Sequence, residues 1–208
     1  MKQIENIIFD LGDVFINIDP DLTYQAFATL AGLPKETLEK RFDELEVFDR
    51  YEKGMLNEAE FITFLIRELN LKVGYETIYQ AWNEILLDIP LKRVKLLHKL
   101  KEKGYNLYFL SNTSEIHIKE VNAILYRTSG MKDLKDLVIK PYYSYELGMR
   151  KPDKRIYEYV LQDAQLTPQK TLFLDDNEDN IKAASTLGIH TILVEKKSDI
   201  TVYLSEFV

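Results

Sequence analysis

Short apolar runs alternate with helical segments along much of this chain, and this alternation constrains the fold more than any other feature. Strands separated by helices imply right-handed crossover connections and a parallel sheet. The sequence therefore predicts an α/β fold with a doubly wound, Rossmann-like parallel sheet. The predicted strands are residues 4–9, 105–110, 171–174 and 190–194, with a shorter apolar run at 137–139. The predicted helices between and after them are residues 94–103, 114–125, 155–161 and 179–187.

Residues 17–90 interrupt this alternation. Their pattern is helical, and Asn57 followed by Glu60 is typical of a capping box at a helix start. We count about four helices and no strand in this stretch. The sequence thus predicts two domains, a core made of residues 1–16 plus 91–208 and an inserted helical domain at 17–90.

Composition excludes several classes of protein. A net charge of −7 without a cluster of basic residues disfavours binding to nucleic acid or to an anionic membrane surface. There is no cysteine, which excludes disulfides and thiolate chemistry. No apolar run approaches the ~20 residues that span a bilayer. The first six residues carry Glu5 where a secretory signal needs an apolar run, so we expect a cytoplasmic protein.

Acidic and polar residues follow three of the predicted strands. Asp10 follows the first, Ser111 and Asn112 the second, and Asp175 with Asp176 the third. In parallel sheets, ligands bind beyond the carboxyl ends of the strands. A single aspartate there is often only a turn or cap residue, but several converging carboxylates repel one another. A hard cation such as Mg²⁺ removes that repulsion and prefers oxygen ligands.

Lys151 is the candidate cation of this region. It lies in the run Gly148-Met149-Arg150-Lys151-Pro152, just before a predicted helix. A lone lysine is usually a solvated surface residue. Beside a carboxylate cluster it can instead neutralise charge and hold a phosphate.

Four motifs occur in order along the chain: Ile8-Phe9-Asp10-Leu11-Gly12-Asp13-Val14, Phe109-Leu110-Ser111-Asn112, Gly148 to Pro152, and Phe173-Leu174-Asp175-Asp176-Asn177-Glu178-Asp179-Asn180. They span almost the whole chain. Together they resemble the haloacid dehalogenase superfamily of hydrolases and look closest to a subgroup of bacterial sugar-phosphate phosphatases. The 17–90 insertion is similar to the helical cap of many such enzymes.

This resemblance implies a Mg²⁺-dependent phosphatase that acts on a small phosphorylated metabolite. Asp10 would be the nucleophile and would form an aspartyl-phosphate. The implied Mg²⁺ ligands are Asp10, the backbone carbonyl of Gly12 and Asp176, with Asp175 nearby or bound through water. The groups implied to hold the phosphoryl group are Ser111, the backbone around Asn112, and Lys151.

One position departs from the family pattern. Most family phosphatases carry an aspartate two residues after the nucleophile as general acid and base, whereas this chain has Gly12 there and Asp13 one place later. The carboxylate of Asp13 can instead reach the position of this missing acid, and the backbone freedom of Gly12 would make that easier. Alternatively, the leaving group departs with little protonation. We include Asp13 among the candidate catalytic residues.

Other functions remain open at this stage. A metal-independent 2-haloacid dehalogenase does not need an aspartate at position 12, but leaves Asp175 and Asp176 unexplained. A catalytically weak binding or regulatory protein of the same fold would account for Gly12, and a phosphotransferase would usually need the missing acid. For the phosphatase we expect a monomer or a weak homodimer whose partner is the small metabolite alone.

Residues of the insertion and the histidines have simpler interpretations. We expect Trp82 to pack in a core and the three dispersed histidines, His98, His117 and His190, to be structural or solvated. The Lys53-Gly54 turn is either a plain turn or a loop that points at the active site and selects the leaving group. Residues 17–20 are the expected hinge into the insertion.

Overall fold

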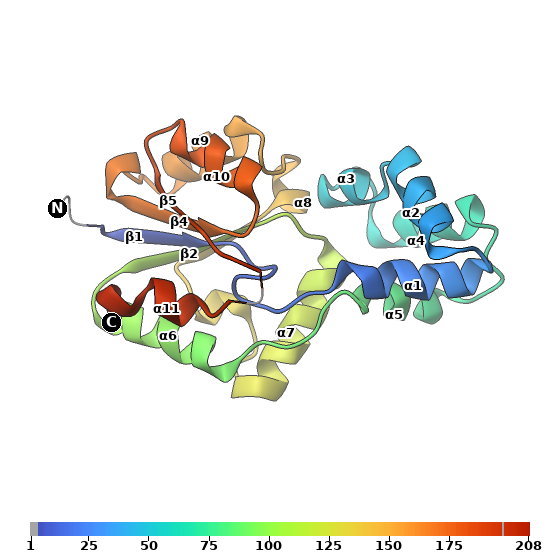
Figure 1. Ribbon diagram of the computed structural model, residues 1–208, viewed down its shortest axis with the longest axis horizontal. Helices are drawn as coiled ribbons and strands as arrows, with labels where there is room; N and C mark the ends of the chain where they lie inside the picture. The colour runs from blue at the N-terminus through green and yellow to red at the C-terminus, as the bar shows by residue number, and fades with distance from the viewer. Residues whose placement is uncertain (1–3, 197) are drawn as a thin grey trace.

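The sheet of the computed structural model has five parallel strands in the order β3-β2-β1-β4-β5 (Figure 1). The structure describes residues 4–196 and 198–208. The strands are β1 (Asn6–Phe9), β2 (Asn106–Ser111), β3 (Lys140–Tyr143), β4 (Thr171–Asp175) and β5 (His190–Leu193). The doubly wound α/β fold predicted from the alternation of strands and helices is confirmed.

Helices cover both faces of the sheet, and alternate strand residues face them. Ile7 and Phe9 pack in one hydrophobic cluster, whereas Ile8 packs in another on the opposite face. This two-residue alternation lets a short, wholly apolar strand be buried on both sides. The first face carries α6 (Leu91–Glu102), α7 (Glu115–Ser129) and α11 (Ile200–Tyr203), and the second carries α9 (Lys154–Asp163) and α10 (Glu178–Ser185).

The third strand in chain order lies later than the sequence predicts. The apolar run at 137–139 was expected to be a strand, but β3 begins at Lys140 and a 3₁₀ turn precedes the run at Leu134–Asp136. Leu137 and Val138 are buried in the core as part of the connection rather than of the sheet. The strand itself contains Pro141, which an edge strand tolerates because its outer side needs no donor.

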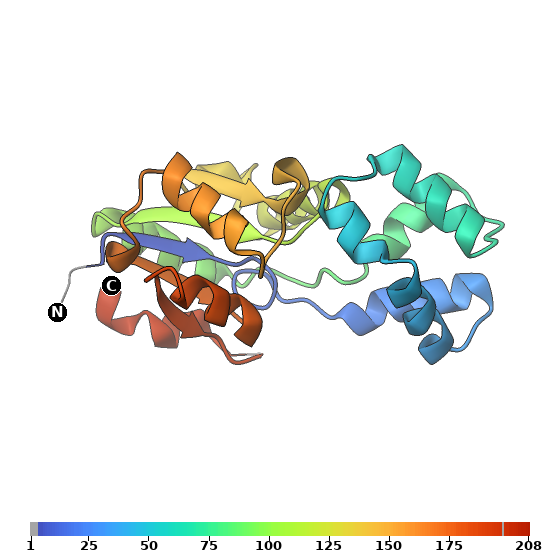
Figure 2. The same cartoon turned by 90° about the horizontal axis from the view of Figure 1, so that it is seen from above.

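Residues 17–90 form a helical part beside the sheet-bearing part (Figure 2). Its own hydrophobic cluster includes Phe27, Phe61 and Trp82. The sequence count of about four helices was one too low, because Val47–Glu52 is a separate short helix. The capping box at Asn57 and Glu60 is confirmed. The five helices are α1 (Pro20–Ala31), α2 (Lys35–Glu44), α3 (Val47–Glu52), α4 (Glu58–Glu68) and α5 (Tyr75–Asn83).

Trp82 of α5 joins the helical part to α7 of the sheet-bearing part. Its indole N–H donates to the Ser114 Oγ, 3.2 Å away, and its ring stacks on the ring of His117 with centroids 5.1 Å apart. The Nε2 of His117 lies 3.0 Å from the Trp82 carbonyl oxygen. Ile116 of α7 also belongs to the hydrophobic cluster of the helical part. Trp82 is therefore a core residue, as expected, and the core it completes spans both parts.

The two connections between the parts pair with each other. Asn17 N–H donates to the Asp88 carbonyl and Leu87 N–H donates to the Asn17 carbonyl, so residues 17–18 run antiparallel to residues 86–88. The chain therefore leaves and re-enters the sheet-bearing part at one place.

A second contact between the parts involves Gly54, which follows α3. It has φ +64°, and a Cβ built on it would lie 2.2 Å from the carbonyl oxygen of Tyr145. Tyr145 belongs to the short helix α8 (Ser144–Leu147), which follows β3. Glycine is needed here both for its left-handed backbone and for the absence of a side chain.

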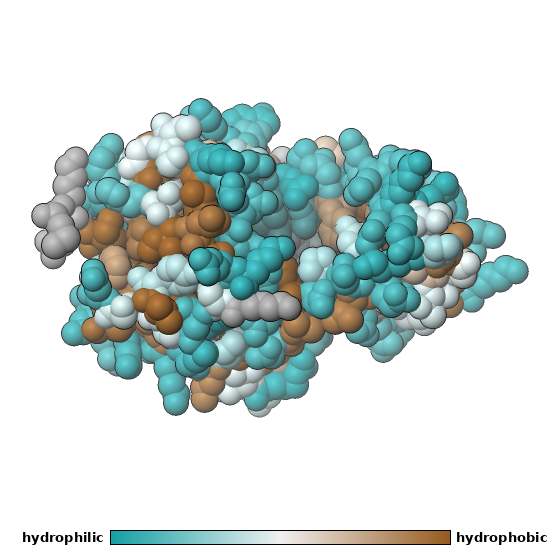
Figure 3. Space-filling model, viewed as in Figure 1, coloured by the Kyte–Doolittle hydropathy of each residue, from teal (hydrophilic) through white to brown (hydrophobic). Residues whose placement is uncertain are grey.

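On the face shown in Figure 3, hydrophilic residues cover most of the helical part. Within the described ranges, no helix combines the length and hydropathy that crossing a bilayer requires.

Gly54→Ala tests the contact with Tyr145, with Gly32→Ala as its control. Both glycines have φ +64°, but a Cβ on Gly32 meets nothing within 4 Å. The left-handed backbone should cost each variant about 1–2 kcal/mol, and the clash should cost Gly54→Ala at least about 2 kcal/mol more. Urea denaturation gives the free energy of unfolding of each variant, and equal losses would contradict the predicted contact.

His117→Gln tests the buried stack with Trp82 through the pH dependence of stability. Burial lowers the pKa of His117 to about 4, against the effect of its bond to the Trp82 carbonyl. The unfolded chain therefore binds more protons below pH ~6.5, so stability is lost as pH falls towards 4. Between pH 7 and pH 5 the wild type should lose about 1–2 kcal/mol more than His117→Gln, measured by urea denaturation. Parallel losses in the two proteins would show that His117 is not buried in its neutral form.

Candidate active site

The register of three neighbouring strands brings the predicted polar residues to one edge of the sheet. Phe9 of β1 pairs with Phe109 of β2 on one side and with Leu174 of β4 on the other. Asp10, the next residue, continues this pairing by donating its N–H to the Leu174 carbonyl at 2.9 Å. Asp10 therefore lies between the ends of β2 and β4, which are Ser111 and Asp175.

Lys151 lies at the centre of this edge and is 2% exposed. Its Nζ is 2.8 Å from Asp10 Oδ1 and 2.6 Å from Asp175 Oδ2. It also donates to the Leu110 carbonyl at 2.9 Å. The alternative of a solvated surface lysine is thus wrong, because three oxygen atoms surround the buried ammonium group.

The charges of this group of residues are strongly coupled. Burial raises the pKa of Asp10 to about 7, and repulsion from Asp175 and Asp176 adds to the rise that Lys151 opposes. Burial alone would lower the pKa of Lys151, but Asp10 and Asp175 outweigh burial and raise it. Lys151 therefore stays charged, and its single positive charge is shared between two carboxylates.

Three carboxylates of the site are close enough to hold one cation. Asp10, Asp175 and Asp176 each offer a carboxylate oxygen, and these atoms lie within 4.8 Å of one another. Burial, followed by repulsion from Asp175 and Asp13, raises the pKa of Asp176. With one lysine among three acids, negative charge is in excess. The residues present therefore fit a hard divalent cation such as Mg²⁺.

Asp175 is fully buried and is held by neighbours that the sequence analysis did not assign. Asn180 Nδ2 donates to both carboxylate oxygens at 2.9 and 3.1 Å, and the Asn177 N–H donates to Oδ1 at 2.9 Å. Asn177 also caps the start of α10. The only signal in the sequence was the position of both asparagines in the fourth motif. These bonds hold the carboxylate of Asp175 in place, and this carboxylate in turn fixes the ammonium group of Lys151.

Ser111 is the last residue of β2 and Asn112 follows it, and the two side chains have different surroundings. The Asn112 side chain donates to the Lys151 carbonyl at 2.9 Å and accepts from the Lys151 N–H at 2.8 Å. Its amide group therefore fixes the backbone of Lys151. Ser111 is 3% exposed, and its Oγ lies 3.4 Å from the Asn112 carbonyl.

The chain turns sharply after Asp10. Asp13 adopts φ +53°, and its Oδ1 accepts from the Ile18 N–H at 3.3 Å. A Cβ on Gly12 would lie 2.9 Å from Ile18 Cδ1, so Ile18 occupies the space beside Gly12. Asp13 is near enough to Asp176 to raise its pKa. The turn thus places Asp13 beside the carboxylate cluster and also gives it a local structural contact.

Charged residues of α3 face the site from the helical part. Arg150, the neighbour of Lys151, has its Nη2 2.9 Å from Glu52 Oε2 and its Nη1 3.4 Å from Asp49 Oδ1. Lys53 Nζ lies 2.8 Å from Asp49 Oδ2. The sequence did not predict a role for Arg150, Asp49 or Glu52, because a helical pattern does not show how α3 is oriented towards the site.

The two acids of α3, Glu52 and Asp49, have pKa values shifted in opposite directions. Burial raises the pKa of Glu52 to about 7, although Arg150 and Lys151 oppose the rise. Burial also acts to raise the pKa of Asp49, but the bonds from Lys53 and Arg150 outweigh it and leave this pKa lowered. Asp49 is therefore ionised throughout the neutral range.

The chain resembles known proteins over nearly its whole length. A D-ribitol-5-phosphate phosphatase of Bacteroides thetaiotaomicron is 32% identical over 197 residues, which are 95% of each protein. A crystal structure of a HAD family enzyme from the same organism is 35% identical, has a TM-score of 0.90 and covers 98% of this chain and 99% of that one. A further crystal structure of this enzyme, in complex with magnesium and inorganic phosphate, is 36% identical, has a TM-score of 0.87 and covers 96% and 98% of the two chains.

The family model of haloacid dehalogenase-like hydrolases matches residues 4–188. This range includes every residue of the site described above. The chain therefore belongs to the haloacid dehalogenase-like hydrolase family.

Proposed function

We propose that this protein is a Mg²⁺-dependent phosphatase that hydrolyses a small phosphorylated metabolite, of the sugar-phosphate class, through an aspartyl-phosphate on Asp10. The observation that carries the proposal is the buried Lys151 ammonium between Asp10 and Asp175, with Asp176 completing a cluster of three carboxylates. The similarity to a sugar-alcohol phosphatase and to an enzyme crystallised with magnesium and phosphate supports it.

In the first step, a carboxylate oxygen of Asp10 attacks phosphorus. A bond forms between this oxygen and phosphorus, the bond to the leaving oxygen breaks, and the leaving oxygen takes the electron pair and then a proton. In the second step, water attacks phosphorus, inorganic phosphate departs and the carboxylate of Asp10 is regenerated. Both steps also require that the negative charge on the phosphoryl oxygens is stabilised.

The surrounding residues have separate roles in the proposal. Lys151 binds the phosphoryl oxygens and offsets their charge, while Ser111 and the backbone at Asn112 donate hydrogen bonds to them. Asp175 holds Lys151 in place. Asp10, Asp176 and the Gly12 carbonyl would hold Mg²⁺, which when bound supplies positive charge to the phosphoryl oxygens.

We further propose that residues 17–90 act as a cap over this site and that residues 1–16 plus 91–208 form the hydrolase core. The paired connections at residues 17–18 and 86–88 and the separate hydrophobic cluster of the helices support this division. The cap brings Lys53 and Asp49 to the side of the site where the leaving group must lie. The expected cytoplasmic location and the expected monomer or weak homodimer stay predictions.

The dehalogenase alternative predicts a different site. Halide displacement needs no metal, so it gives no role to three carboxylates whose oxygen atoms lie within 4.8 Å of one another. A non-catalytic protein would likewise have no need of a nucleophile aligned with a buried lysine. Both alternatives are outcomes of the experiment below.

Asp10→Asn should abolish hydrolysis of p-nitrophenyl phosphate. The amide cannot attack phosphorus, so kcat should fall by more than about 10³-fold. EDTA should stop the wild-type reaction, and added Mg²⁺ should restore it. The control is Asp43→Asn on the exposed surface of α2, which should keep the wild-type rate. Dehalogenation that resists EDTA, or no turnover of any phosphomonoester, would refute the proposal.

Asp13→Ala should lower turnover, and Asp13→Asn should reveal why. General acid–base catalysis contributes ~10²–10⁴-fold in rate. If Asp13 exchanges protons with the leaving group, both variants lose kcat, because neither side chain carries a carboxyl group. Asparagine can still accept the hydrogen bond from Ile18, so a purely structural Asp13 would leave Asp13→Asn active. Wild-type steady-state rates in both variants would exclude any catalytic part for Asp13.

A further inference from the structure

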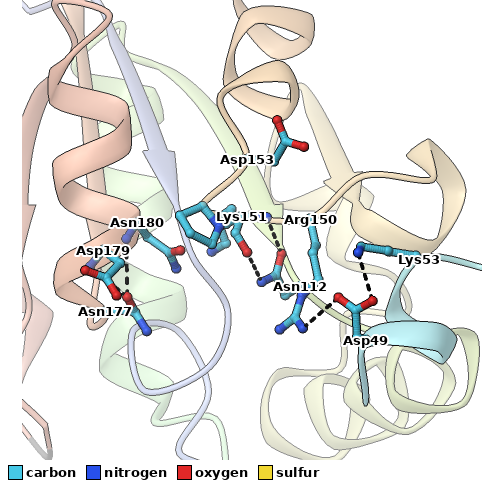
Figure 4. Close-up of a pocket in the computed structure, with 10 residues that line it drawn as sticks. Asp49, Lys53, Asn112, Arg150, Lys151, Asp153, Asn177, Asp179 and Asn180 are labelled. Carbon is cyan, nitrogen blue, oxygen red and sulfur yellow. Dashed lines mark hydrogen bonds and ion pairs between the residues drawn. The ribbon is translucent and has the colours of Figure 1, made fainter. Parts of the chain in front are cut away.

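A cavity of about 360 Å³ lies between α3 of the helical part and the start of α10 in the sheet-bearing part (Figure 4). Lys151 and Asn112 line it, so it is continuous with the place proposed for the phosphoryl group. The remaining walls include Asp49, Lys53 and Arg150. Because the phosphoryl group is fixed at Lys151, the rest of the substrate must extend into this cavity.

The charges of the cavity wall cancel. Three acidic and three basic side chains line it, and Lys151 is already shared between two carboxylates of the site. Of the other two cations, Lys53 is paired with Asp49, and Arg150 is paired with both Asp49 and Glu52. Asp49 thus contacts both cations on the cap side of the cavity, as Figure 4 shows.

This pairing determines which leaving groups the cavity can accept. An anionic group that reaches Lys53 or Arg150 also lies close to the carboxylate of Asp49, because Asp49 contacts both cations. Asp49 repels such a group and already offsets the positive charge that would attract it, which is a cost in binding free energy. A neutral hydroxyl group avoids this cost, because it can donate to Asp49 and accept from Lys53 while both remain paired.

We propose that Asp49 is a specificity-determining residue that restricts the leaving group to neutral, hydroxyl-rich molecules and excludes those with a carboxylate or a second phosphate. This inference rests on the proposed phosphatase function and deepens it. It assigns the selection to one carboxylate of α3 that neutralises Lys53 and Arg150.

The first test compares substrates that differ only in the charge of one end group. Sorbitol 6-phosphate and 6-phosphogluconate form one such pair, and glycerol 3-phosphate and 3-phosphoglycerate form another. Wild-type kcat/KM should be at least about tenfold higher for the neutral member of each pair. Assays at pH 8 keep Glu52 ionised, since its pKa is about 7.

The second test is Asp49→Asn. Losing this carboxylate removes the ion pair of Lys53 and leaves Arg150 paired with Glu52 alone, so the net charge of the cavity becomes more positive by one. The ratio of kcat/KM for the anionic substrate to that for the neutral one should rise at least about tenfold, and added salt should reduce the rise. Asp43→Asn changes the net charge equally from an exposed position on α2 and should leave the ratio unchanged. Adding Lys53→Met to Asp49→Asn should return the ratio towards the wild-type value.

The results that would overturn the role of Asp49 differ from the result that would refute the phosphatase proposal. A wild-type enzyme that prefers the anionic member of each pair would overturn this role, and so would an Asp49→Asn ratio equal to that of Asp43→Asn. Because the readout is a ratio, a general loss of activity in Asp49→Asn does not imitate the expected result. Failure of the wild type to hydrolyse any phosphomonoester with Mg²⁺ would instead refute the phosphatase proposal.

Discussion

The buried ammonium group of Lys151 is the interaction on which the site depends. Alone, Asp10 and Asp175 could not be buried beside each other as anions, because each loses hydration and repels the other. With Lys151 2.8 and 2.6 Å away, both can be held at the sheet edge. Burial still raises the pKa of Asp10 to about 7, and repulsion from Asp175 and Asp176 adds to the rise. One lysine faces three clustered carboxylates, and this excess of acidic groups is the electrostatic reason why the site suits a divalent cation.

The sheet and its motifs were predictable, because they depend on local patterns. Asp10 follows β1, Ser111 ends β2 and Asp175 ends β4, and parallel pairing brings the carboxyl ends of such strands to one edge of the sheet. The strand predicted at 137–139 was wrong, because Leu137 and Val138 are buried in the connection and β3 begins at Lys140. An apolar run indicates burial, but it does not show whether the residues are buried in a strand or in a loop. The pairing of β1 with β4, which sets Asp10 beside Asp175, is a long-range property that local patterns do not specify.

The side of the site that faces the helical part could not be predicted from the sequence. The Arg150–Glu52 and Arg150–Asp49 pairs join residues about a hundred positions apart, and nothing local specifies them. The close approach of Gly54 to Tyr145 is similar, since a glycine in a turn indicates backbone freedom but not what lies against it. Asn180 was visible in a motif, yet its bonds to Asp175 depend on how α10 packs against β4.

The contacts that the helical part makes around Trp82 and around Arg150 differ in chemistry, and the second of them forms part of the cavity wall. Around Trp82 the contact is buried and largely apolar: Trp82 is fully buried, stacks on a neutral His117 and shares a hydrophobic cluster with Ile116. Around Arg150 the contact consists of ion pairs with Asp49 and with the nearly buried Glu52, and a partly exposed pair such as Arg150–Asp49 typically contributes only ~0–1 kcal/mol. The stronger contact therefore lies away from the cavity, and the weaker one forms its wall. Because the Arg150–Asp49 pair contributes little to the stability of the contact, these side chains can select a substrate by its charge.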